Sequence, residues 1–321
     1  MDKYQRTGTW FYCTNVLFPL LLVVTGAVLK PLLALGVVVA WLAFVAMDPV
    51  EFKDGRPVRE QANTDMIKLM REFFSLRFHR TETVQKQLMT CHKTGQSIFA
   101  VFPHGVNSDF RYLMDGMMYD HFADTFNKSP IRTLAASVLF KIPGVRQACL
   151  ATSCVDASRK TAEHNLKKGR SLLILPGGED EQIATIYGKE RVFLRKRMGF
   201  IKLAIRFGVP VTPAYVFGSS DCYYTSSLFL GLRKTVMKAL RICLPIYWGQ
   251  LGCIAYPNPL GFPLRVPQNI VFGDPILFPQ DDSPEKEVVS AAHAQFVTAL
   301  TKLFNDHKKD YGFGDRELEV L

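Results

Sequence analysis

The sequence predicts an α/β domain built on a mixed or mostly parallel sheet with flanking helices, preceded by an N-terminal transmembrane helical hairpin. Two observations predict this arrangement. Long uncharged runs precede residue 48, and beyond it short apolar runs of strand length alternate with longer segments of helical periodicity. The chain has 321 residues, 48% of them hydrophobic, which permits a sizeable core and excludes a disordered or fibrous chain.

The uncharged runs are predicted to be membrane helices. They extend from Trp10 to Leu29 and from Leu32 to Met47, and the first is about long enough to cross a bilayer of roughly 30 Å. Lys30-Pro31 lies between them and is the expected bend of the hairpin, while a single crossing helix is the alternative. Basic residues flank both outer ends, which favours a cytosolic position for both. The predicted division is an anchor over 1–47 and one domain over 48–321.

The segments after the anchor are assigned by periodicity and by their breaker residues. One or two helices are predicted within 63–89. Buried strands are predicted at 97–102, 149–155, 171–175, 211–217 and 269–272. Further helices are predicted at 157–168, 191–207 and 284–307. The apolar stretch 228–251, interrupted by a few polar residues, is expected to be either an interfacial helix or a core helix. Because strands and helices alternate, the chemistry is expected in the loops that follow the strands.

Composition narrows the class of partner. Lysine plus arginine is 39 against 29 for aspartate plus glutamate, which gives a net charge of +10 and indicates an anionic partner. A mean hydropathy of +0.07 and 24 phenylalanines favour a protein that works at lipid over one that binds nucleic acid. The seven cysteines form no C-x-x-C pair and do not cluster with histidine, so neither a disulfide framework nor a metal site is expected.

The loop after the first predicted buried strand carries the candidate catalytic pair. It begins Phe102-Pro103-His104-Gly105, and Asp109 follows five residues after the histidine. A carboxylate at this spacing can accept the imidazole N–H, fix the tautomer and leave the other ring nitrogen free as a base. Under the alternative interpretation, Asp109 only caps a helix and His104 is an ordinary loop residue.

Two further segments suggest substrate contacts. Gly177 and Gly178 follow the strand at 171–175 and let the backbone approach a ligand closely, while Glu181 either accepts a hydrogen bond from a hydroxyl or holds the loop. The stretch 189–202 is rich in basic residues that suit the phosphates of coenzyme A or of an anionic bilayer. A solvated helix face is the alternative. Its basic residues are Lys189, Arg191, Arg195, Lys196, Arg197 and Lys202.

Four motifs in this order resemble those of the type 2 diacylglycerol acyltransferase family, which includes monoacylglycerol and wax-alcohol acyltransferases. They are F-P-H-G at 102–105, D-A-S-R at 156–159, P-G-G-E-D-E at 176–181 and G-K-E-R-V-F-L-R-K-R-M-G-F at 188–200. The resemblance covers nearly the whole chain. Three positions depart from the family pattern. Phe102 replaces a histidine or glutamate, so only His104 carries over from that motif. Asp109 is an acid where many family members have none, and Gln250 replaces an arginine after Trp-Gly.

The resemblance implies a glycerolipid-acyltransferase-like fold and transfer of a fatty acyl group from acyl-coenzyme A to diacylglycerol, giving triacylglycerol. It implies that His104 is the base and that Asp109 orients it. Acyl-coenzyme A is then a substrate, and no cofactor is expected. The implied substrate-binding residues are Phe102, Pro103, Gly105, Arg159, Gly177, Gly178, Glu181, Arg195, Lys196, Arg197 and Gly199.

The resemblance also bears on location and on rival functions. It implies the endoplasmic reticulum membrane with the catalytic domain facing the cytosol, and the lipid droplet as a second location; membrane lipid is then a partner, and a homo-oligomer is compatible. Monoacylglycerol, a wax alcohol or a lysophospholipid are alternative acceptors, the last because the H-x-x-x-x-D spacing occurs in glycerophospholipid acyltransferases. A non-catalytic lipid-binding membrane protein is the alternative outside the enzyme class.

Overall fold

A seven-stranded sheet organises the chain in the computed structural model, which describes residues 24, 26, 28, 30–240, 243–250 and 262–321. In their order across the sheet, the strands are β1 (Arg77–His79), β10 (Asn269–Phe272), β7 (Val211–Phe217), β2 (Ile98–Phe102), β5 (Ser171–Ile174), β3 (Ile131–Ala135) and β4 (Cys154–Asp156). The strands from β7 to β4 are all parallel, whereas β10 is antiparallel to β7, and β1 is parallel to β10. The predicted mixed, mostly parallel sheet is confirmed.

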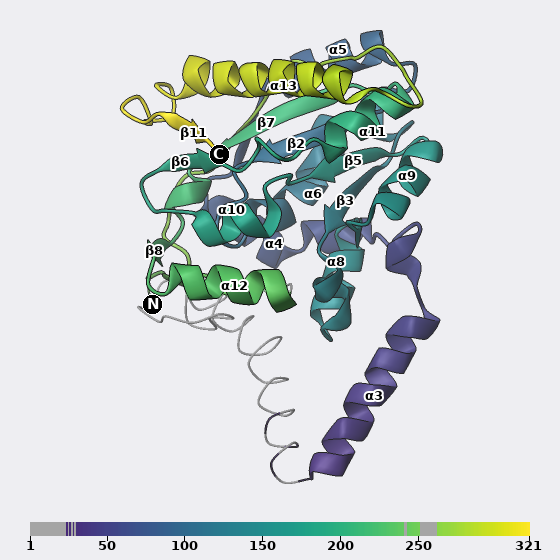
Figure 1. Cartoon of the computed structure of the whole chain (residues 1–321), viewed down its shortest axis with the longest axis vertical. Helices are drawn as coiled ribbons and strands as arrows, with labels where there is room; N and C mark the ends of the chain where they lie inside the picture. The colour runs from purple at the N-terminus through teal and green to yellow at the C-terminus, as the bar shows by residue number, and fades with distance from the viewer. Residues whose placement is uncertain (1–23, 25, 27, 29, 241–242, 251–261) are drawn as a thin grey trace.

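Helices cover both faces of this sheet, as the central strand β2 shows. All five β2 side chains are buried; Ile98, Ala100 and Phe102 belong to one core, and Phe99 and Val101 to the other. The first core includes residues of α9 (Arg159–Lys167), α11 (Gly199–Phe207) and α13 (Lys286–His307) (Figure 1). The second includes residues of α4 (Asp65–Phe73), α5 (Thr81–Cys91), α6 (Asp109–His121) and α7 (Ala123–Phe126). The fold is therefore three layers, α/β/α.

Smaller elements extend the domain at the edges of these layers. Two strand pairs lie outside the main sheet: β6 (Glu190–Val192) is parallel to β11 (Leu318–Val320), and β8 (Tyr224–Ser226) is antiparallel to β9 (Ile246–Trp248). The remaining α-helices after the N-terminal one are α8 (Val145–Ala151), α10 (Gly178–Ala184) and α12 (Leu230–Leu240). The short 3-10 helices are η2 (Val50–Phe52), η3 (Arg59–Asn63), η4 (Ser137–Lys141) and η5 (Ser219–Asp221).

The helix α3 (Pro31–Met47) projects away from these layers (Figure 1). None of its residues is buried. With the turn that follows it, the segment Pro31–Phe52 contains an 18-residue stretch with a mean hydropathy of 2.1, and it is long enough to cross a membrane. Its carboxyl-terminal half touches the domain, where Trp41 Nε1 donates to the Lys141 carbonyl at 2.7 Å. An N-terminal apolar helix is thus present. The first arm of the predicted hairpin, Trp10–Leu29, lies almost entirely outside the described residues, so the hairpin and the division at residue 47 stay predictions.

Several predicted elements differ from the structure because distant pairing overrides local pattern. Residues 149–155, predicted as one strand, contain the end of α8, a turn at Ser153 with φ +60°, and most of β4. Residues 191–207, predicted as one helix, contain part of β6 and then α11, since β6 pairs with β11 at the far end of the sequence. The stretch 63–89 contains α4, β1 and most of α5, and the described part of 228–251 contains α12 and β9.

Candidate active site

The loop after β2 carries His104 to the carboxyl edge of the parallel strands, where the sequence predicts the chemistry. The Phe102–Pro103 peptide bond is cis, and Phe102 itself is buried in the core, its ring 6.2 Å from that of Phe296. Gly105 has φ +65°, and a Cβ there would lie 2.5 Å from Ser219 Oγ. Only glycine fits both the conformation and the space, so the turn that follows His104 is fixed by its sequence.

The imidazole of His104 is oriented within its own loop. Nδ1 lies 3.0 Å from the Gly105 carbonyl oxygen, and because a carbonyl only accepts, this hydrogen bond requires the proton on Nδ1. Nε2 then keeps its lone pair, as a general base must. Ser108 Oγ lies 2.9 Å from Nδ1 and 3.1 Å from Nε2. Burial lowers the pKa of His104 below its ordinary value, so the neutral, basic form predominates at neutral pH.

Ser108 holds the loop in an uncommon conformation. It precedes α6 with φ +52°, a region that costs a non-glycine residue roughly 1–3 kcal/mol. Its hydroxyl donates to the His104 carbonyl at 2.9 Å and lies beside the imidazole, and no side-chain hydrogen bond from it caps α6. Strain of this kind persists where the surroundings fix it, and here it keeps a hydroxyl against the candidate base.

Asp109 begins α6 and pairs with Tyr223. The Tyr223 hydroxyl donates to Asp109 Oδ1 at 3.2 Å, and no hydrogen bond joins Asp109 to His104 among the described residues. Burial raises the pKa of Asp109 to about 6, although the Tyr223 hydroxyl lowers it. Catalytic hydrogen bonds often tighten only in the substrate complex, so the pairing of Asp109 with His104 stays a prediction.

Glu181 ties the two predicted loops together. It lies in α10, is buried, and uses both carboxylate oxygens: Oε1 accepts from the His104 backbone N–H, and Oε2 accepts from the Phe193 N–H at 2.7 Å. Burial raises the pKa of Glu181 to about 7, while these two backbone donors favour the ionised form. Of the two roles considered for Glu181, holding the loop is the one its contacts in this structure support.

Gly177 leaves room for that carboxylate. A Cβ at Gly177 would lie 2.2 Å from Glu181 Oε2 and 2.4 Å from its Cδ. The next residue, Gly178, has φ +53° and open space around it, so the backbone conformation, and not a lack of space, favours glycine at this position. Both predicted glycines therefore shape the loop around Glu181, and their contact with a substrate stays a prediction.

The carboxyl-terminal strand supports the other anchor of Glu181. β6 leads directly into Phe193, and β11 lies alongside it. Leu194 and Arg195 donate their backbone N–H groups to the Leu321 carbonyl oxygen at 2.9 and 2.8 Å, and the Leu321 N–H donates to Val192 at 2.8 Å. The position of the Phe193 N–H is therefore set by the last residues of the sequence.

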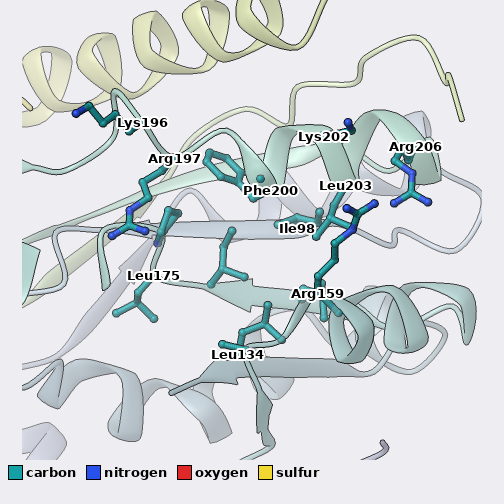
Figure 2. A pocket seen from close by; sticks show the side chains of 16 residues that line it. Ile98, Leu134, Arg159, Leu175, Lys196, Arg197, Phe200, Lys202, Leu203 and Arg206 are labelled. Carbon is teal, nitrogen blue, oxygen red and sulfur yellow. The ribbon is translucent and has the colours of Figure 1, made fainter. Parts of the chain in front are cut away.

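A cavity of about 490 Å³ lies on the α9 and α11 side of the sheet (Figure 2). Its floor is apolar, formed by strand residues such as Ile98 and Ile174 together with Phe200. Five basic residues also line it, and none of the acidic residues in the described part of the chain does. These are Arg159, Lys196, Arg197, Lys202 and Arg206. In Figure 2, Lys196 and Arg197 approach from one end, and Arg159, Lys202 and Arg206 from the other.

Acidic residues just outside the cavity hold some of these cations. Arg197 Nη2 lies 2.5 Å from Asp180 Oδ2. Glu163 Oε1 lies 2.8 Å from Arg159 Nε and 2.5 Å from Arg206 Nη1, and these two arginines lower the pKa of that carboxyl. The two guanidinium groups at this end are therefore oriented before any ligand binds.

The structure places most of the predicted residues in two groups, one around His104 and Glu181 and one that lines the cavity. Arg159, Lys196, Arg197 and Gly199 line the cavity, whereas Arg195 is exposed and does not. His104 does not line it either; Leu175 and Pro176 do, and the loop that they begin leads to Glu181 and so to the His104 backbone. Within the described ranges, no group of three His, Cys, Asp or Glu residues has metal-binding geometry.

Three residues of the site, Ser108, Tyr223 and Arg206, were not predicted, and Lys202 was predicted only within the basic stretch 189–202. Ser108 and Tyr223 are seen only in three dimensions, because nothing local marks their contacts with His104 and Asp109. The positions of Lys202 and Arg206 can be predicted from the sequence. With Gly199 they have the spacing of one helix face, i, i+3 and i+7, and that face borders the cavity.

A histidine with an unprotonated Nε2 lies at the edge of a parallel sheet, and a basic cavity with an apolar floor lies on one face of that sheet. Together they define a class of enzyme that activates a hydroxyl beside an anionic amphiphile. The diacylglycerol acyltransferase family matches residues 23–321, and the chain belongs to that family. The resemblance seen in the four motifs, and the acyltransferase class that they predict, are thereby confirmed.

Individual relatives are similar at modest identity. The chain is 29% identical over 263 residues to diacylglycerol O-acyltransferase 1 of Saccharomyces cerevisiae, covering 79% of this chain and 62% of that protein. It is 28% identical to diacylglycerol O-acyltransferase 2 of Mus musculus, with 87% and 72% covered. It is 25% identical to acyl-CoA wax alcohol acyltransferase 2 of Homo sapiens, with 88% and 85% covered.

Among solved structures, the 1-acyl-sn-glycerophosphate acyltransferase of Thermotoga maritima aligns with a TM-score of 0.41 and 14% identity. The alignment covers 83% of this chain and 93% of that one.

Proposed function

We propose that the protein transfers a fatty acyl group from acyl-coenzyme A to the free hydroxyl of diacylglycerol, giving triacylglycerol. The observation that carries the proposal is the orientation of His104, whose Nδ1–H is held by the Gly105 carbonyl and whose Nε2 is left as a base. Family membership and the names of the relatives support the same reaction.

In the proposed reaction, His104 Nε2 removes the proton of the acceptor hydroxyl as its oxygen attacks the thioester carbonyl carbon. The carbon–sulfur bond of the resulting tetrahedral intermediate then breaks, and the coenzyme A thiolate leaves and takes the proton from the imidazolium. Asp109 stabilises that imidazolium, and backbone N–H groups of the loop or of the first turn of α6 stabilise the oxyanion. No covalent acyl-enzyme and no cofactor are needed.

The basic cavity is the proposed binding site for the coenzyme A phosphates. Its cations offer charge-assisted hydrogen bonds, and its apolar floor accepts the less polar parts of the ligand. Arg159 and Arg206 are pre-oriented by Glu163, which lowers the cost of ordering them around a phosphate. Lys196 and Arg197 serve from the other end, while Arg195 would reach only a part of the ligand that lies outside the cavity.

The protein is proposed to act at the endoplasmic reticulum membrane, or at the lipid droplet, with its catalytic domain in the cytosol. α3 supplies the apolar segment for insertion. Both substrates are amphiphiles, so the site must lie close to the lipid surface that holds the acceptor.

The test is an assay of membranes that contain the protein, with labelled acyl-coenzyme A and a panel of acceptors. Wild type should form triacylglycerol, and His104→Ala should lower the rate by a factor of about 10²–10⁴, the usual contribution of a positioned general base. Arg195→Ala changes an exposed residue outside the cavity and should retain far more activity. Transfer by His104→Ala at the wild-type rate would exclude His104 as the base.

A lysophospholipid acceptor is the second candidate, and the spacing of His104 and Asp109 favours it. The same acceptor panel separates the two, because product formed only with phosphorylated acceptors would contradict the diacylglycerol proposal. If the wild type transferred to no alcohol at all, the non-catalytic lipid-binding alternative would hold.

A further inference from the structure

An exposed apolar surface surrounds the start of α12. Phe229 is 67% exposed, Leu232 is 65% exposed and Leu228 is 57% exposed, which is unusual for side chains of this size. Tyr187 and Tyr224 continue the patch, with ring centroids 4.7 Å apart. We call these five residues the α12 surface. The reaction and the cavity described above use none of them.

Specific hydrogen bonds hold the α12 surface in its exposed conformation. The buried Arg233 donates to the Leu228, Ser226 and Leu244 carbonyls at 2.9, 2.7 and 3.2 Å and so fixes the turn that presents Leu228 and Phe229. Phe229 has φ +53°, a conformation that is rare and costly for a bulky residue. The chain thus keeps a strained phenylalanine whose side chain points mainly into solvent.

Charge along this part of the sequence has one sign. Residues 222–273 contain no Asp or Glu, and Lys234 and Lys238 follow along α12. A second copy of the chain would bring the same positive charges against each other, which disfavours self-association here. Aromatic and aliphatic side chains with lysines nearby suit the interface of an anionic bilayer instead.

Position in the fold points to the same partner. α12 lies at the end of the catalytic body from which the apolar helix α3 projects (Figure 1). α13, by contrast, lies at the opposite end (Figure 1). A bilayer that receives α3 therefore lies on the side of the domain that carries the α12 surface.

The α12 surface is also joined to the candidate active site. Leu230 and Met237 of α12 pack against Ile183 of α10, the helix that carries Glu181. On the other side, Tyr224 of the surface directly follows Tyr223, whose hydroxyl holds Asp109. Contact with lipid here would therefore occur beside two segments that bond to residues of the candidate active site.

We propose that the α12 surface is a second membrane contact, which inserts Phe229, Leu228 and Leu232 at the bilayer interface and sets its lysines near lipid phosphates. Together with α3 it orients the domain so that the candidate active site lies close to lipid. This inference goes beyond the proposed reaction, because a chain without transferase activity would make the same contact.

The test uses the full chain in vesicles of phosphatidylcholine and phosphatidylserine that contain a phosphatidylcholine with a diazirine near the top of its acyl chain. After irradiation and digestion, mass spectrometry locates the label. Label is expected on the peptide containing 224–232 and on α3. It is not expected on the start of α13, where Val288 is 47% exposed but lies at the opposite end of the domain.

Variants identify the side chains responsible. Phe229→Asp combined with Leu232→Asp should lower labelling of the 224–232 peptide about tenfold, the factor expected when a large apolar side chain no longer leaves water. Labelling of α3 should not change, and Val288→Asp is the matched control. Phe229→Gly keeps the proposal testable if the double variant misfolds: it relieves the positive φ, so it should unfold no more easily than wild type while losing label.

Two outcomes would overturn the proposal. Label on α3 with none on 224–232 would show that α3 alone contacts the bilayer. Cross-links between copies through 224–232, without lipid label, would assign the surface to self-association.

Discussion

A methyl group at Gly177 would collide with the carboxylate that holds the His104 loop. Gly177 has φ −61° and ψ −37°, a helical conformation that alanine adopts freely, so Gly177→Ala carries no backbone penalty. The new Cβ would lie 2.2 Å from Glu181 Oε2, well inside van der Waals contact, and Glu181 must move. The substitution therefore tests the carboxylate without removing it.

The expected loss of stability follows from the two hydrogen bonds that Glu181 would lose. Its two hydrogen bonds, to the His104 and Phe193 N–H groups, join backbone donors to a charged acceptor. Bonds of this kind contribute about 1.5–3 kcal/mol each, and the displaced carboxylate regains some hydration. We expect Gly177→Ala to lower the free energy of unfolding by about 3 kcal/mol. The turnover number should fall about 100-fold, because misplacing a base by about 1 Å has that effect.

The assay pairs denaturant unfolding with formation of triacylglycerol from labelled acyl-coenzyme A. Gly314→Ala is the control, since its new Cβ would meet Lys309 Cγ at 3.4 Å and Lys309 Cα at 3.9 Å, which are ordinary contacts. It should match wild type in both measurements. If Gly177→Ala kept both its stability and its turnover number close to those of wild type, Glu181 would not be what positions His104.

Three further predictions concern the groups around this centre. The pKa of Glu181 is about 7 in the folded state against an ordinary 4.5, so between these pH values the folded state holds a proton that the unfolded state has lost. As pH rises through that range, the free energy of unfolding of wild type should therefore fall by roughly 3 kcal/mol relative to that of Glu181→Gln. Parallel pH profiles of unfolding for the two proteins would contradict this. Tyr223→Phe removes a hydrogen bond that lowers the pKa of Asp109, so the acidic limb of kcat/KM, if Asp109 controls it, should move to higher pH, as a pH–rate profile would show. Lys202→Ala and Arg206→Ala should each raise KM for acyl-coenzyme A about tenfold, and more salt should shrink the difference from wild type; an unchanged KM would place the phosphates elsewhere.

The central strands were predictable because burial on both faces leaves a plain signal. β7 and β10 match their predicted bounds, and β2 and β5 match to within a residue, since each is a short run of mainly apolar residues. β3 escaped prediction because Arg132 interrupts its apolar run. That arginine is buried but satisfied, its Nε donating to the Asp54 carbonyl at 2.7 Å, a partner far away in the sequence.

The site was predictable in its parts and not in its connections. His104, Glu181 and the glycines stand out locally because a loop after a buried strand needs special residues. The contacts between these residues cannot be seen locally. Glu181 bonds to His104 across 77 positions of the sequence, and Arg316 bonds to Glu190 across 126. Contacts at such separations depend on strand order, which local periodicity does not encode. The same reason explains why Arg195 was grouped with Arg197 although only Arg197 lines the cavity.

The pairing of β11 with β6 makes the carboxyl terminus part of the scaffold that holds His104. Leu321 fixes Leu194 and Arg195, the neighbouring Phe193 holds Glu181, and Glu181 holds the histidine loop. We therefore expect deletion of residues 318–321 to lower the activity by displacing His104, although none of these four residues belongs to the site.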